Sequence, residues 1–96
     1  MKCFDFMIEQ IFEEYEDSEE YIEHALKYKE THRNLADALV QISSQELAHA
    51  GVLRNHLSKM IETSGHEMWS KIYEYMIPKY MDMEEKIRRM HDMYRM

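Results

Sequence analysis

The stretch Ile42-Ser43-Ser44-Gln45-Glu46-Leu47-Ala48-His49-Ala50 places two polar side chains, Glu46 and His49, in an otherwise apolar helical row. With Glu46 and His49 included, the members of that row follow one another at steps of three or four, as on one face of an α-helix, and its apolar members are Leu35, Leu39, Ile42, Leu53, Leu57 and Met60. A carboxylate in such a row needs a partner, because burying it unpaired is costly. His49, one turn after Glu46, points the same way. The stretch therefore predicts a helix that presents Glu46 and His49 to a metal or to a buried partner.

The composition indicates a small all-α protein. A chain of 96 residues has room for one domain, and its two glycines and one proline leave little material for turns. Hydrophobic residues make up 45% and charged residues 32%, as expected for amphipathic helices. We expect helices over residues 5–29, 35–63 and 66–95. The first two form an antiparallel hairpin, with Thr31 or Asn34 capping the second, and Pro78 kinks or splits the third.

Charge and hydropathy exclude several classes of protein. A net charge of −7 argues against nucleic-acid binding, which needs a basic face. No apolar run approaches the roughly 20 residues that span a bilayer. The N-terminus lacks an apolar signal region, and the lone Cys3 allows no internal disulfide. We therefore expect a cytoplasmic protein that binds neither nucleic acid nor membrane.

One glutamate of the first helix is expected beside Glu46 and His49. Among the acids of that segment, Glu14 lies nearest the centre of the apolar row by helical angle, with Glu19 next and Glu16 also open as a choice. In a hairpin, residues equidistant from the turn lie at the same level. The midpoints of Glu14 with Glu46 and with His49 both fall inside the expected turn, so angle and height agree.

The third helix carries a stripe of aromatic, methionine and isoleucine residues: Trp69, Ile72, Met76, Tyr80, Met83, Ile87, Met90 and Tyr94. It follows a turn at Ser64-Gly65, and methionine-rich stripes are typical of adaptable subunit contacts. This supports an alternative function, a non-enzymatic oligomerisation or partner-binding protein. In that case Glu46 pairs with a basic residue of the third helix or of a neighbouring chain, and His49 is a hydrogen-bonded core residue.

The other histidines are expected to be less important. His24, His32, His66 and His91 have the pattern of surface residues, and His56 is expected to be half-buried or an outer ligand.

Carboxylates with one imidazole per metal suit iron or manganese better than structural zinc. A carboxylate-bridged site in a helical bundle needs one Glu from each of two helices and a Glu-x-x-His from each of two others. The chain holds half of that set, so a two-fold axis must supply the rest from a second copy.

Glu14, Tyr21, Ala25 and the run Glu46-Leu47-Ala48-His49-Ala50 together resemble the pattern of rubrerythrins and ferritin-like proteins, and are most similar to that of encapsulated ferritins. The resemblance covers roughly Phe12 to Met60. It implies a four-helix bundle completed by dimerisation, in a homodimer or larger even-numbered oligomer. Two iron ions per subunit pair would be bound by Glu14, Glu46 and His49, with Tyr21 beside these ligands and manganese or zinc as substitutes.

The activity implied by the resemblance is that of a ferroxidase. Such a centre oxidises Fe(II), with oxygen taking an electron from each metal, for iron storage or detoxification. The catalytic residues would be Glu14, Glu46, His49 and Tyr21. The resemblance also implies packaging inside an encapsulin-type protein shell, a nanocompartment of the cytoplasm.

Overall fold

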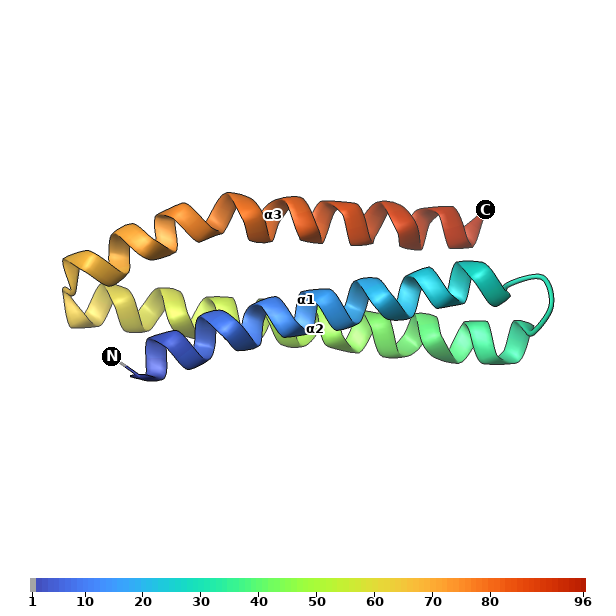
Figure 1. The fold of residues 1–96 in the computed structure, drawn as a ribbon, viewed down its shortest axis with the longest axis horizontal. Coiled ribbons are helices and arrows are strands. Elements are labelled where there is room, and N and C mark those ends of the chain that lie inside the picture. Colours follow the sequence, from blue (N-terminus) through green and yellow to red (C-terminus); the bar gives the residue numbers. More distant parts are fainter. Residues whose placement is uncertain (1) are drawn as a thin grey trace.

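The computed structural model describes residues 2–96, which form three helices: α1 (Lys2–Tyr28), α2 (Arg33–Ser64) and α3 (Glu67–Arg95). They make a rod of 51 × 19 × 14 Å. In Figure 1, α1 and α2 form an antiparallel hairpin, and α3 turns back along it and runs parallel to α1. The predicted all-α class and three-helix order are confirmed, with helix ends that differ from the predicted ones by only a few residues.

The two connections differ in how they end and begin the helices. The residue before α2 is His32, which makes no side-chain capping hydrogen bond, and the Thr31 hydroxyl instead bonds His32 Nδ1 at 2.9 Å. The predicted caps are therefore wrong, because α2 begins at Arg33 and Asn34 already lies in its first turn. Gly65 ends α2 in the left-handed conformation, with φ of 63°, and donates its N–H to Ile61 O at 3.3 Å. This confirms Gly65 as the helix stop.

Pro78 lies inside α3, which continues across it as one helix from Glu67 to Arg95. Pro78 therefore does not split the helix. The kink that a proline normally introduces, by removing one backbone hydrogen bond, stays a prediction.

The core lies along the line where the three helices meet. The first helix buries Phe4, Ile11, Tyr15, Ser18 and Ile22, and the third buries Trp69, Tyr80, Ile87 and Tyr94 of its predicted stripe. The second helix differs, because its buried residues are Ala36, Ser43, Ala50, Leu57 and Ile61. Only Leu57 belongs to the predicted row, and Leu35 is 49% exposed. The row that carries Glu46 and His49 therefore borders the core of the single chain.

Polar contacts join all three helices at the middle of the core. Ser18 Oγ donates to Ser43 O and Ser43 Oγ donates to Ser18 O, each at 2.7 Å. His91 Nε2 lies 2.9 Å from Ser43 Oγ, and this histidine is only 5% exposed. The expectation that His91 is a surface residue is wrong. Small serine side chains let α1 and α2 approach closely, and the hydrogen bonds offset the cost of burying hydroxyls there.

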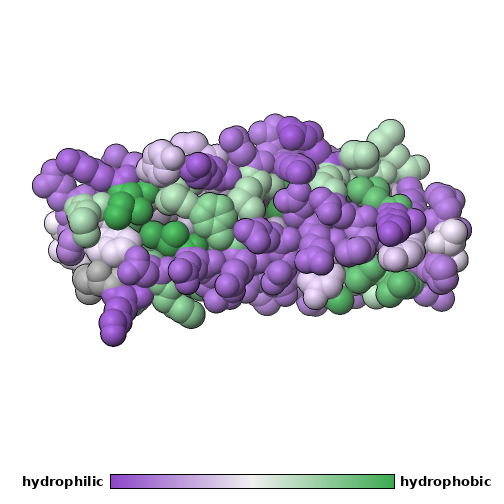
Figure 2. Space-filling model, in the orientation of Figure 1, coloured by the Kyte–Doolittle hydropathy of each residue, from purple (hydrophilic) through white to green (hydrophobic). Residues whose placement is uncertain are grey.

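On the face shown in Figure 2 most side chains are hydrophilic, and apolar side chains form patches between them along the rod. Within residues 2–96, none of the helices combines the length and the apolar character that crossing a membrane requires.

Candidate metal centre

Glu14 of α1 and Glu46 and His49 of α2 form the one group of potential metal ligands found among the described residues. Each offers a ligand atom, and these atoms all lie within 4.8 Å of one another. The hairpin register predicted from the sequence is therefore confirmed. The turn places Glu14 level with Glu46 and His49, so side chains from distant parts of the chain converge.

Glu14 is the most enclosed member of the group, with a side chain that is 14% exposed. Its Oε1 accepts a hydrogen bond from Gln10 Nε2 at 3.3 Å. Its Oε2 is buried and, while Glu46 is ionised, has no hydrogen-bond donor within residues 2–96; His49 Nδ1 lies 3.5 Å away. A buried carboxylate oxygen without a donor is costly, so this position favours a cation.

The proximity of Glu14 raises the pKa of Glu46 to about 7. The largest cause is a hydrogen bond between the two carboxyl groups, followed by loss of solvation and by the charge of Glu14, whereas His49 lowers the pKa. Two carboxylates this close repel each other unless a proton or a cation lies between them. In the chain alone, Glu46 holds that proton near neutral pH.

The ring of His49 lies on the outside of the single chain, with 60% of its side chain exposed. His49 is therefore not a core residue of the single chain. Because the core row of α2 runs through Ser43 and Ala50, Glu46 and His49 lie at its border.

The group lies on the side of the hairpin that faces away from α3. Phe12 and Tyr15 pack against Tyr80 of α3, with ring centroids 5.2 and 5.9 Å apart. Two residues along a helix correspond to a rotation of about 200°, so Glu14 points away from the α3 contact made by Phe12. No basic side chain of α3 forms an ion pair with Glu46 within residues 2–96, which removes that alternative partner in the single chain.

The other two acids considered for the first helix lie elsewhere. Glu16 is exposed and does not belong to the group. Glu19 forms an ion pair with Lys86 of α3, on the opposite side of α1. Of the three candidates, Glu14 is therefore the one that the fold places beside Glu46 and His49.

Tyr21 lies two turns after Glu14 and is partly buried. It lines a hollow of about 350 Å³ with Asp17, His24, Leu35 and other residues near the first turn of the fold. Among the described residues, its hydroxyl makes no hydrogen bond to Glu14, Glu46 or His49. Contact between Tyr21 and the ligand group stays a prediction.

The remaining histidines lie outside the group. His24 and His32 are exposed, as predicted, whereas His66 is half-buried, contrary to the prediction. His56 is exposed and lines a hollow beside Phe4 and Met60, so the expectation that it is half-buried is wrong. The buried polar residue that was not predicted is His91. The pattern that could have identified it is the helical row that it continues with Ile87 and Tyr94.

Two carboxylates and one imidazole form a donor set that suits a divalent cation such as iron or manganese. Comparisons of the chain with models of protein families, with curated proteins and with solved structures found no match. A function must therefore be proposed from the site itself.

Proposed function

We propose that the protein is a ferritin-like iron-binding protein that oxidises Fe(II) with oxygen at a site shared between two subunits. The observation that carries this proposal is the convergence of Glu14, Glu46 and His49 within 4.8 Å across the hairpin. The resemblance of these residues to the ferritin-like pattern supplies the reaction. Storage or detoxification of iron is the outcome that it suggests.

The electrostatics of the group fit a divalent cation. With both carboxyl groups ionised, the buried Oε2 of Glu14 has no hydrogen-bond donor, and the proton that Glu46 keeps to about pH 7 supplies one. A cation between the two carboxylates would satisfy Glu14 and displace the proton of Glu46. The neutral imidazole of His49 would complete the half-site of one chain.

Iron supplies the redox chemistry when bound, and the chain supplies binding and charge. Glu14 and Glu46 bring two negative charges to the metal, and His49 brings a neutral nitrogen. Three ligands cannot fill the positions of a carboxylate-bridged pair of metals, which takes about six side chains from protein. A second copy of Glu14, Glu46 and His49 across a two-fold axis would complete the set.

The open face of the hairpin supports this sharing. Next to Glu46 and His49, α2 presents apolar side chains that α1 and α3 cover only in part, including Leu39, Ile42 and Leu53. Leu35, at the end of the same row, is 49% exposed. A partner laid on this row would bury apolar area, which favours association, and would also enclose the exposed ring of His49.

Anaerobic titration with Fe(II), followed by exposure to oxygen, tests the proposal. The natural chain should bind two iron ions per subunit pair and oxidise them, with zinc as a redox-inert competitor. Glu46→Gln and His49→Ala should lose binding and oxidation together while the far-ultraviolet circular dichroism stays unchanged. Glu9→Gln removes one exposed acid of α1 outside the group and is the matched control.

Stoichiometric iron binding by Glu46→Gln and His49→Ala, with the Glu9→Gln control behaving like the natural chain, would disprove the site. Iron bound equally weakly by all four proteins would show that the acidic surface, rather than a built site, attracts the metal.

A second candidate is a helical partner-binding protein without catalysis. The observation in its favour is the exposure of large apolar side chains along α3, among them Tyr75, Met81 and Met93 at 68%, 47% and 56%. Methionine and tyrosine are common at adaptable contact surfaces. Metal content after purification in the presence of iron separates the two candidates, since a partner-binding protein needs none.

A further inference from the structure

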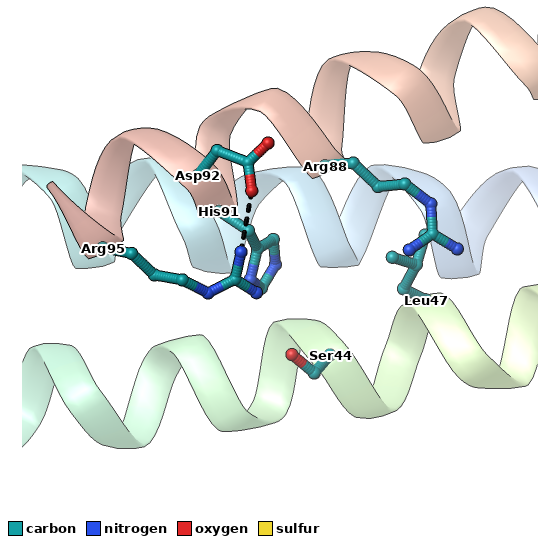
Figure 3. A pocket seen from close by; sticks show the side chains of 6 residues that line it. All are labelled: Ser44, Leu47, Arg88, His91, Asp92 and Arg95. Carbon is teal, nitrogen blue, oxygen red and sulfur yellow. Dashed lines mark hydrogen bonds and ion pairs between the residues drawn. The ribbon is translucent and has the colours of Figure 1, made fainter.

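A second polar site lies between α2 and α3, and it contains no member of the metal-ligand group. Figure 3 shows this hollow of about 220 Å³, lined by Ser44, Leu47, Arg88, His91, Asp92 and Arg95. Four of its residues come from α3 and two from α2. Five of the six have polar side chains, so the hollow is poorly suited to an apolar ligand.

Two arginines against one aspartate give the hollow a net positive charge. In Figure 3 the side chains of Arg88 and Arg95 extend from α3 along the gap toward α2, with His91 between them. Arg95 forms an ion pair with Asp92 at 2.7 Å, and Arg88 pairs with Glu84 at 3.4 Å. Both arginine side chains are largely exposed, 70% and 64%, and exposed ion pairs of this kind are weak enough to be exchanged for a better anion.

The hydrogen bonds of His91 leave one of its ring nitrogens available. Ser18 and Ser43 use both of their hydroxyl protons in donating to each other's backbone carbonyls. With the Ser43 proton placed on Ser18 O, the shorter of its contacts, His91 Nε2 carries a proton and donates it to Ser43 Oγ at 2.9 Å. In the neutral ring Nδ1 is then unprotonated, so it is the atom that gains a proton when His91 becomes charged.

The charges around His91 work against that protonation. Burial lowers the pKa of His91, Arg95 and Arg88 lower it further, and Asp92 opposes them. These three charged groups all lie on α3, while the contact from α2 is the neutral hydroxyl of Ser43. The two arginines repel a cation, which argues against a second metal site here.

We propose that this hollow binds a small oxyanion of the phosphate class between the guanidinium groups of Arg88 and Arg95, beside His91 and the hydroxyl of Ser44. A guanidinium presents its N–H groups as a planar fork that matches the oxygens of such an anion. An anion held there would also offset the positive charges of Arg88 and Arg95, which otherwise disfavour protonation of His91. The site would then take up a proton at Nδ1 of His91 as it fills.

Histidine-ring NMR of the metal-free protein provides the test, with inorganic phosphate as the probe. The pKa of His91 should rise by roughly half a unit or more in phosphate relative to chloride at equal ionic strength, because a nearby anion favours the charged ring. The exposed His24 on α1 lies outside the hollow and is the control, since its ring signals should respond alike to the two salts.

Neighbouring arginines on one helix provide matched variants. Arg88→Gln and Arg95→Gln should each weaken phosphate binding, read from the shift of His91, by about tenfold, the size of one charge-assisted hydrogen bond. Arg89→Gln removes the same charge from α3, but Arg89 pairs with Glu85 and does not line the hollow. The Arg89→Gln protein should therefore bind phosphate as tightly as the natural chain. All three arginines are exposed, and circular dichroism checks that the variants fold.

Either of two results would overturn the proposal. One is a His91 pKa that moves no more in phosphate than in chloride. The other is an Arg89→Gln protein that loses as much affinity as Arg88→Gln, which would mean that only the general charge of α3 attracts phosphate. Neither result depends on iron, so these experiments test the anion site independently of the metal site.

Discussion

His49 Nδ1 lies 3.5 Å from Glu14 Oε2, across the two helices of the hairpin and on the side that α3 leaves uncovered. One partner is nearly enclosed, at 14% exposure, and the other is 60% exposed. The carboxylate therefore keeps little of its solvation, while the imidazole can still meet a ligand or a second chain. This difference in exposure between Glu14 and His49 is what we expect if one chain contributes only half of a metal site.

The pH dependence of stability should report on Glu46. Its pKa is about 7 in the folded chain against 4.5 as the ordinary value, so the folded state binds more protons than the unfolded state between these limits. The free energy of unfolding of the metal-free protein should therefore fall as the pH rises from 4.5 to 7. We expect a loss of about 1 kcal/mol, less than the full pKa difference implies, because solvent screens a partly exposed pair.

Urea unfolding at pH 5 and pH 7.5 measures this change. Glu46→Gln keeps a neutral hydrogen-bonding group beside Glu14 and should remove most of the decline. Glu20→Gln, an exposed acid of α1 that pairs only with His24 at 3.9 Å, should retain it. A natural chain whose stability rises steadily between these pH values would show that Glu46 is ionised there.

Replacement of Tyr21 by Phe should leave the amount of bound iron unchanged. Tyr21 lies two turns from Glu14, in a hollow beside Leu35, and its hydroxyl bonds none of the three ligand residues in the single chain. In the assembled protein we expect it to bond a ligating carboxylate and to influence the rate, so oxidation should slow by less than roughly tenfold. Stopped-flow absorbance and iron analysis measure the two effects. Complete loss of iron would mean that Tyr21 is itself a ligand.

Ser43→Ala should destabilise the fold by about 2 kcal/mol. The change leaves His91 Nε2 without its partner at 2.9 Å and ends the reciprocal bonding with Ser18, all within the core. The neighbouring Ser44→Ala is the control, because Ser44 is exposed and its loss should change stability by less than about 0.5 kcal/mol. Denaturant unfolding compares the two. Equal stabilities would show that the buried hydroxyl contributes nothing net.

The helical periodicity of the apolar residues predicted the helices, and the short turn predicted the hairpin. The convergence of Glu14 with Glu46 and His49 could be predicted because it depends only on the number of residues between each of them and that turn. The face of α2 was harder to predict. Apolar residues mark its border row, whereas the row that packs in the core includes the small residues Ala36, Ser43 and Ala50. Hydrophobicity alone favours the wrong row, since close helix contact selects small side chains.

His91 was missed for a related reason. A histidine between charged neighbours is normally predicted to be a surface residue. His91 is buried because Ser43 of α2 provides a hydrogen-bonding partner for its ring. Such a pairing depends on three helices at once, and the local sequence shows only that His91 continues the helical row of Ile87 and Tyr94. The same holds for the exposure of His49, which follows from where α3 packs rather than from the composition of α2.

The shared site also makes metal binding and assembly interdependent. Because each chain offers only Glu14, Glu46 and His49, a metal should bind the assembled protein far better than the free subunit. By mass action a ligand specific for the assembly stabilises it by about 2.7 kcal/mol when its free concentration is about a hundred times the dissociation constant.

Sedimentation of the natural chain at low micromolar concentration, without oxygen and with or without Fe(II), tests this most directly. The shared-site proposal predicts a shift toward a dimer or larger even-numbered oligomer when Fe(II) is added, and no such shift for His49→Ala. A chain that stays monomeric while binding its full complement of iron would contradict the proposal and require a complete site within one subunit.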